Sequence, residues 1–108
     1  MANPKLIHLL GEIVKKVDKM KPKPRYEDRE FGIYSLPCKV LHIPNYNKKV
    51  FKGLEKEFET RLSHSIMIPG IFCNVKVVYN VDKDTYDVSI CKFDEEVFWM
   101  IIDTIGEE

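Results

Sequence analysis

The chain contains residues of the types that perform catalysis, but their spacing does not indicate a catalytic site. Ser63, His64 and Ser65 place two hydroxyls beside an imidazole. Adjacent residues of a helix point apart, however, and a nucleophile must lie within hydrogen-bond reach of its base. Cys38 and His42 share one face of an extended segment, which defines no mechanism. G-x-S-x-G, H-E-x-x-H and phosphate-binding glycine motifs are also missing from the sequence. We therefore expect a non-enzymatic protein with no catalytic residues and no cofactor.

The cysteines and histidines do not predict a metal centre or a disulfide framework. Cys38, Cys73 and Cys91 have no C-x-x-C spacing, and an odd number of cysteines fits poorly with a disulfide framework. Asp82, Asp84 and Asp87 superficially resemble a calcium loop, but the glycine and the closing glutamate of such a loop are missing. We expect no bound metal.

Clustered positive charge makes nucleic-acid binding the alternative function. Six basic residues and one acidic residue lie between Lys15 and Arg25. A second basic group, Lys48, Lys49 and Lys52, lies at the start of the expected second helix, where positive charge opposes the helix dipole and a bound phosphate would relieve the conflict. The net charge of zero and the six acidic residues after residue 93 argue against a polyanionic ligand. The candidate nucleic-acid-binding residues are Lys15, Lys16, Lys19, Lys21, Lys23, Arg25, Tyr26, Lys48, Lys49 and Lys52.

Apolar residues in excess of what one sheet requires favour protein binding. Trp99 lies outside the apolar arc of the expected last helix, and Met100 lies on its flank. The first helix has a heptad-like apolar stripe that suits a partner helix, although packing on its own sheet would explain it too. Trp99 could likewise lie under the first helix within one monomer. The candidate partner-binding residues are Trp99, Met100, Leu6, Leu10, Ile13 and Val17.

We therefore interpret the chain as a small interaction module of the adaptor or inhibitor type that associates with itself as a homodimer. Compact domains of this kind are common among phage and viral accessory proteins. No apolar run approaches the roughly 20 residues that span a bilayer, and the N-terminus does not resemble a signal peptide. We expect a cytoplasmic protein with no membrane partner.

The length of 108 residues, with 44% hydrophobic and 31% charged residues, suits a single domain over residues 1–108. Asn3 and Pro4 begin a helix over residues 4–20. An exposed linker rich in charge and proline follows over residues 21–30 and joins this helix to an α/β core over residues 31–105. Residues 31–43 are extended, with Pro37 indicating a bulge, an edge position or two short strands.

The second half of the chain predicts a helix and then a β-hairpin. Val50, Phe51, Leu54, Phe58 and Leu62 form a stripe at helical spacing. That helix ends at residues 63–65. Alternating residues predict a hairpin over residues 72–93. With a loop over residues 82–85, the inward pairs are Val81 with Tyr86, Tyr79 with Val88, and Val77 with Ile90.

Asp94 caps the last helix of the chain. The expected fold class is α+β, with element order α-β-α-β-β-α. The sheet should be mixed and contain three or four strands, with strands 38–43 and 72–81 parallel and the helices mainly on one face.

Overall fold

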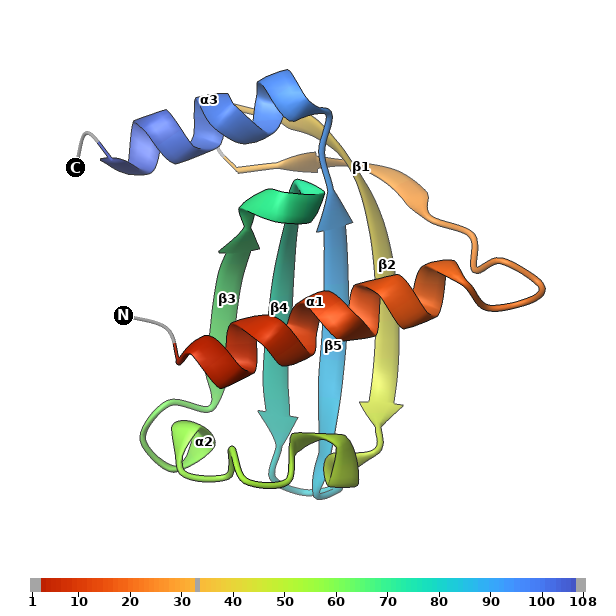
Figure 1. Cartoon of the computed structure of the whole chain (residues 1–108), viewed down its shortest axis with the longest axis vertical. Coiled ribbons are helices and arrows are strands. Elements are labelled where there is room, and N and C mark those ends of the chain that lie inside the picture. The colour runs from red at the N-terminus through yellow and green to blue at the C-terminus, as the bar shows by residue number, and fades with distance from the viewer. Residues whose placement is uncertain (1–2, 33, 107–108) are drawn as a thin grey trace.

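The computed structural model, which describes residues 3–32 and 34–106, contains three α-helices and five strands (Figure 1). Two short 3₁₀-helices, η1 and η2, lie in the connections. In chain order the elements are α1 (Pro4–Asp18), β1 (Glu27–Phe31), β2 (Leu36–Tyr46), η1 (Lys48–Phe51), α2 (Glu57–Thr60), β3 (Ser63–Ile68), η2 (Pro69–Ile71), β4 (Cys73–Asn80), β5 (Thr85–Lys92) and α3 (Glu95–Gly106). The α+β class and the single domain are confirmed.

The five strands form one antiparallel sheet in the order β1-β2-β5-β4-β3. The predicted mixed sheet of three or four strands is therefore wrong. β2 and β4 do run in the same direction, but β5 lies between them and is antiparallel to both. Two further strands, β1 and β3, form the edges of the sheet, and both come from segments that the sequence assigned to a linker or to the end of a helix.

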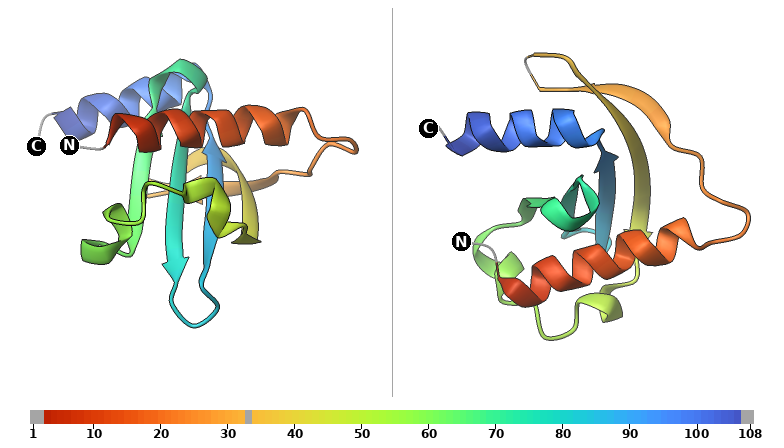
Figure 2. Two further views of the ribbon diagram at one scale, coloured as in Figure 1. Left: turned by 60° about the horizontal axis from the view of Figure 1, so that its bottom comes forward. Right: turned by 45° about the horizontal axis from the view of Figure 1, so that its top comes forward.

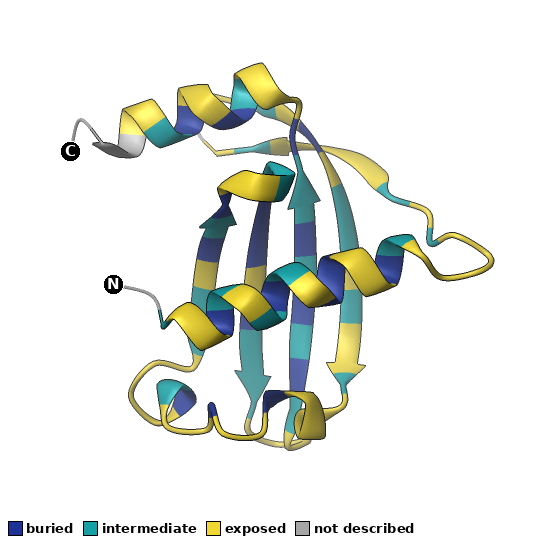
Figure 3. Ribbon diagram, in the orientation of Figure 1, coloured by how far each residue is buried: buried dark blue, intermediate teal, exposed yellow. Residues whose placement is uncertain are grey.

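The helix α1 begins where the sequence predicts and ends two residues earlier than expected, at Asp18. The side chain of Asn3 accepts a hydrogen bond from the N–H of Lys5, and Pro4 occupies the first turn. One face of the helix is buried along its whole length, as the dark stripe in Figure 3 shows. The helix therefore belongs to the core and is not a separate element attached to it.

The charged segment after α1 is only partly a linker. Glu27–Phe31 forms β1 and pairs with β2 from Val40 to Leu36. Pro37 lies in the part of β2 that pairs with β1 alone, because pairing with β5 begins at Lys39. A proline lacks the N–H that pairing with a second neighbouring strand would need. The position of Pro37 therefore agrees with the edge position that the sequence offered as one possibility.

The predicted second helix is largely absent. Its segment forms η1, a turn and the four-residue α2, and Ser63–Ile68 then begins a strand. Gly53 has φ of +89°, a left-handed conformation that glycine adopts without steric cost and that interrupts a helix. Phe51, Leu54 and Phe58 are nevertheless all buried in the main core. These three side chains have the spacing of a helix, but the segment that places them in the core is irregular.

The hairpin of β4 and β5 has the predicted faces but not the predicted register. Tyr79 pairs with Tyr86, Val77 with Val88, and Val75 with Ile90, which is two residues from the predicted pairs. A shift of two residues keeps every side chain on its face, so alternation could not detect it. The loop is Val81–Asp84, and Val81 is 62% exposed instead of inward-facing. The side chain of Asn80 accepts from the N–H of Lys83 and fixes this turn.

Each face of the sheet carries its own core. On the first face, α1 packs against inward residues of the central strands that include Val75, Val77, Val88 and Ile90. On the second face, Phe98 and Ile101 of α3 pack with Cys38 and Phe93 at one end of the sheet. The expectation of helices mainly on one face is therefore not confirmed. In Figure 1 and in the left view of Figure 2 the C-terminal part of α3 extends sideways beyond β3.

Below α3 the second face of the sheet is polar. One row across four strands consists of His42, Ser89, Lys76 and Ser65, which are exposed or half-buried. Nδ1 of His42 lies 3.0 Å from Oγ of Ser89. The second face thus has an apolar end under α3 and an open polar part.

Candidate functional site

The apolar candidates of α1 lie in the protein's own core. Leu6 and Leu10 have no exposed surface, and Ile13 and Val17 are each 3% exposed. They pack with the inward residues of the sheet in one cluster. Of the two interpretations that the stripe allowed, packing on the chain's own sheet accounts for these four side chains, which are not accessible to a partner.

The two apolar candidates of α3 remain on the surface. Trp99 is 43% exposed and Met100 is 57% exposed. The Trp99 ring contacts the rings of Phe98 and Phe72, with centroid separations of 5.4 and 6.4 Å. Trp99 therefore does not lie under α1. It forms the outer part of an aromatic group at the end of the sheet, and it shares the helix with exposed Glu95, Glu96 and Asp103.

The structure brings the basic groups of α1 and η1 to the same side of the molecule. Lys15, Lys16 and Lys19 line a surface hollow of about 410 Å³ whose other wall contains Tyr46 and Val50. Val50 belongs to η1, between the lysines of the second basic group. The hollow thus lies between the lysines of α1 and the η1 segment that contains Lys48 and Lys49. Acidic side chains lie among them, and Lys15 pairs with Glu12 at 3.7 Å.

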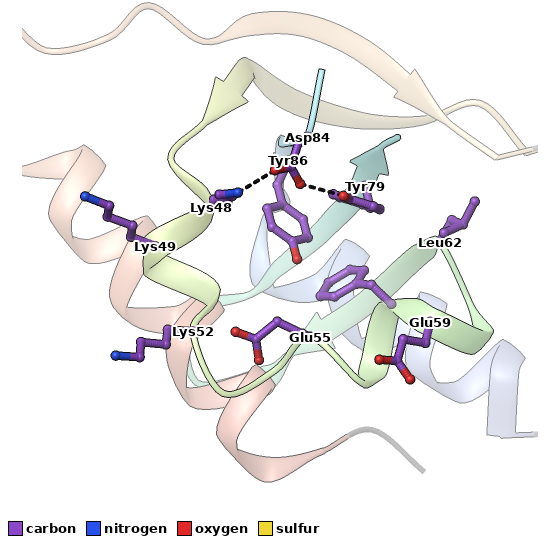
Figure 4. A pocket seen from close by; sticks show the side chains of 10 residues that line it. Lys48, Lys49, Lys52, Glu55, Glu59, Leu62, Tyr79, Asp84 and Tyr86 are labelled. Atoms are coloured by element: carbon purple, nitrogen blue, oxygen red, sulfur yellow. Dashed lines mark hydrogen bonds and ion pairs between the residues drawn. The ribbon is translucent and has the colours of Figure 1, made fainter. Parts of the chain in front are cut away.

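The second basic group lines a hollow of about 530 Å³ whose wall includes three aromatic rings (Figure 4). Oη of Tyr79 donates to Oδ1 of Asp84 at 2.6 Å, and Lys48 forms an ion pair with the same carboxylate. These contacts raise the pKa of Tyr79 and of Lys48 and lower the pKa of Asp84. The hollow is lined by Lys48, Lys49, Lys52, Glu55, Phe58, Glu59, Leu62, Tyr79, Asp84 and Tyr86.

This hollow has mixed charge and does not form a dedicated anion site. Lys48 is already neutralised by Asp84, and the carboxylates of Glu55 and Glu59 line the same hollow as Lys52. Burial raises the pKa of Tyr86, so its phenol stays protonated at neutral pH. The sequence reasoning missed Tyr79, Tyr86 and Asp84. The shared parity of the two tyrosines and their position beside the hairpin loop were the available signals.

The remaining basic candidates lie elsewhere. Arg25 and Tyr26 line a different hollow together with the acidic Glu27 and Asp28. Oη of Tyr26 donates to Asp18 at 3.2 Å, and the Lys92 ammonium lies 4.6 Å from the ring centroid. Burial and then the charge of Asp18 raise the pKa of Tyr26. The ring of Tyr26 is thus occupied on one face by a cation and is not free there to stack on a base.

Lys21 and Lys23 are exposed in the segment between α1 and β1. They lie outside both lysine-lined hollows. The predicted basic segment is thus divided, with its helical lysines near η1 and its later members near β1.

The serines beside His64 and two of the cysteines lie in positions that do not favour nucleophilic reaction. Nε2 of His64 donates to the carbonyl of Glu57 at 3.0 Å, and its ring packs edge-on against Phe58. Ser63 and Ser65 flank His64 in β3, where adjacent side chains point to opposite faces, so both hydroxyls lie on the other face of the strand from the imidazole. Burial raises the pKa of Cys73 to about 11 and that of Cys91 to about 12, which keeps both as thiols at neutral pH.

No group of three or more His, Cys, Asp or Glu side chains suited to a metal ion occurs among residues 3–32 and 34–106. Nor is any helix in that part of the chain long and apolar enough to cross a membrane. Comparisons with protein-family models, curated proteins and solved structures give no significant match to this chain.

Proposed function

We propose that this chain is a small non-enzymatic interaction module, of the adaptor or inhibitor type, whose first partner is a second copy of itself. The observation that carries the proposal is the exposure of Trp99 and Met100 on α3. Phe98 and Ile101 already fill the core beneath this helix, so the fold does not need the two exposed side chains. Tryptophan and methionine are enriched in protein interfaces, where a few large side chains carry most of the binding energy.

The charge distribution supports self-association. The exposed residues of α3 include Glu95, Glu96 and Asp103, and α1 has no acidic residue in its first turn and Lys15 and Lys16 in its last. Opposite charges on two copies favour encounter and orientation more than they add affinity.

Sedimentation velocity over a range from low to high micromolar concentration tests the proposal. Trp99 is the only tryptophan of the chain, so its fluorescence reports directly on this surface. We expect a dimer whose formation shifts Trp99 emission to shorter wavelength. Trp99→Ala should weaken the dimer about tenfold or more, as for a typical interface anchor.

Met20→Ala serves as the matched control, because Met20 is 52% exposed just after the end of α1. It removes a comparable apolar side chain and should leave the association unchanged. A wild-type chain that stays monomeric at high micromolar concentration, or a dimer that Trp99→Ala does not weaken, would contradict the proposal.

Nucleic-acid binding is the second candidate, favoured by the proximity of Lys15, Lys16 and Lys19 to η1. Phosphate contacts by lysines make binding fall steeply with salt. A labelled single-stranded oligonucleotide should then bind at low salt, and the triple change of these lysines to Ala should reduce both the affinity and the salt dependence.

The control for this test changes Lys5, Lys76 and Lys83 to Ala, which removes the same charge from other exposed positions. Equal losses in the two triple variants, or no binding by the wild-type chain at low salt, would reject a specific nucleic-acid surface.

A further inference from the structure

The edge strand β3 has a row of free backbone groups. Its neighbour β4 donates from the N–H of Tyr79 to the carbonyl of Leu62 at 2.8 Å. Hydrogen-bonded and non-bonded pairs alternate along an antiparallel ladder. The even-numbered residues of β3 therefore bond to β4, and Ser63, Ser65 and Met67 direct their N–H and C=O groups away from it.

No other described element occupies that edge. β3 is the last strand in the sheet order, and none of the backbone hydrogen bonds found outside the helices and strands involves Ser63, Ser65 or Met67 within residues 3–32 and 34–106. In Figure 1 the C-terminal part of α3 extends sideways past β3, beyond the end of the strand that leads into η2. Free edge groups of this kind are a template for a further strand.

The side chains of β3 make a second copy of the same strand a suitable occupant. The strand Ser-His-Ser-Ile-Met-Ile contains no Asp, Glu, Lys or Arg. Its only titratable side chain, His64, already donates to the carbonyl of Glu57. Antiparallel pairing of two such strands brings no like charges together and satisfies the two-fold symmetry of the commonest homodimers.

We infer that two copies of the chain pair antiparallel through β3 and form one continuous ten-stranded sheet. With the two-fold axis at Ser65, the outward groups of Ser63, Ser65 and Met67 meet those of Met67, Ser65 and Ser63 in the second copy. About six new hydrogen bonds would form, two for each bonded pair. The exposed Leu62 would face Ile68 of the second copy. The inference rests on the self-association proposed above and adds its geometry.

Amide hydrogen exchange of the ¹⁵N-labelled full chain tests the pairing without any substitution. At low micromolar concentration the amides of Ser63, Ser65 and Met67 should exchange fast. At a concentration where the dimer forms, they should slow about tenfold or more, because their N–H groups are then bonded. The amides of Lys76 and Ser89, in strands with two neighbours, should not change.

Two substitutions at one position separate the backbone from the side chain. Ser65→Pro removes the outward N–H and leaves the bonds of β3 to β4 intact, as edge strands permit. Ser65→Ala keeps that N–H. Both variants lose the same side-chain contact, a hydrogen bond of 3.1 Å from Nδ2 of Asn74. We expect Ser65→Ala to dimerise like the wild-type chain and Ser65→Pro to dimerise at least about tenfold more weakly.

The outcomes distinguish this inference from the proposed function. A dimer in which the amides of Ser63, Ser65 and Met67 remain unprotected overturns the β3 pairing and leaves self-association standing. The same holds for a folded Ser65→Pro variant that dimerises like Ser65→Ala. A wild-type chain that is monomeric at every concentration overturns both.

Discussion

The two edges of the sheet solve the problem of unpaired backbone groups differently. β1 is charged at four of its five positions, Glu27 to Glu30, and its residues are exposed apart from the half-buried Phe31. β3 has no Asp, Glu, Lys or Arg and buries Ile66 and Ile68. Charged side chains on an edge strand oppose pairing with another chain. β1 is therefore protected by charge, and β3 is anchored by burial while its outer edge stays available.

This difference also separates the two roles of an edge strand. β3 contributes two side chains to the main core and is needed for the fold. β1 contributes Phe31 to the smaller core, where its ring packs edge-on against Phe93 with centroids 5.1 Å apart. The strand that stabilises the monomer more is thus the one that we infer to pair with a second copy.

Truncation of one buried side chain in β3 should have the largest effect. Ile66 is 7% exposed and pairs with Val75, so Ile66→Ala should lower the free energy of unfolding by about 2–5 kcal/mol. Asp28→Ala in β1 should change it by less than about 0.5 kcal/mol, because the Asp28–Lys39 ion pair is exposed. Urea unfolding of both variants measures the contrast. Equal losses would show that burial does not distinguish the edges.

Alkaline pH should destabilise the protein through thiols that lie behind the two edges. Cys73 of β4 pairs with Ile68 of the edge strand β3. Cys91 of β5 pairs with Val40 of β2, the neighbour of the edge strand β1. Burial raises the pKa of Cys73 from 9.0 to about 11 and that of Cys91 to about 12. The unfolded chain therefore loses these protons first. Their contribution to stability is complete below pH 9 and falls as pH rises toward the folded-state values.

The loss is at most about 1.4 kcal/mol per pH unit for each thiol that ionises only in the unfolded chain. Cys73→Ala should remove the part of the loss that ends near pH 11, and Cys91→Ala the part that continues toward pH 12. Urea unfolding between pH 8 and pH 11 follows the slope. Variants with the slope of the wild-type chain would contradict the assignment.

Removal of negative charge from β1 should have the smallest effect. Asp28→Thr with Glu30→Thr leaves only Glu27 and Arg29 as charges on this strand. We expect assemblies larger than a dimer at high concentration, with the β1 contact strengthened roughly fivefold for each carboxylate removed, or about 1 kcal/mol.

Light scattering measures this association. Glu59→Gln with Asp82→Asn is the control, since it changes the net charge equally at exposed positions outside both edge strands. Larger assemblies in both variants would attribute the effect to net charge, and none in either would show that charge does not protect β1.

Local sequence patterns predicted the elements that obey one periodicity throughout. The start of α1 followed from Asn3 and Pro4, and the faces of β4 and β5 followed from strict alternation. The register of the hairpin could not be predicted in this way, because a shift of two residues leaves every side chain on the same face. The register depends on the turn that the hydrogen bond to Asn80 fixes. The prediction of a second helix was wrong because Phe51, Leu54 and Phe58 pack in the same core although they do not belong to one helix.

The candidate sites were predicted as residues but not as surfaces. Exposure of Trp99 agrees with its position outside the apolar arc of α3. Leu6 and Leu10, chosen by the same reasoning, are fully buried. Periodicity identifies an apolar face, and the face alone does not say whether the partner is the same chain or another.

The sequence alone determined which faces are apolar, where α1 begins, and that the chain is a single α+β domain, because these depend on residues close together in the chain. Only the tertiary structure decided the antiparallel strand order, the proximity of the lysines of α1 to η1, and the presence of two unlike edges. Those features depend on pairings between distant segments. β3 became an edge because the hairpin filled the centre of the sheet and left Ser63–Ile68 with one neighbour.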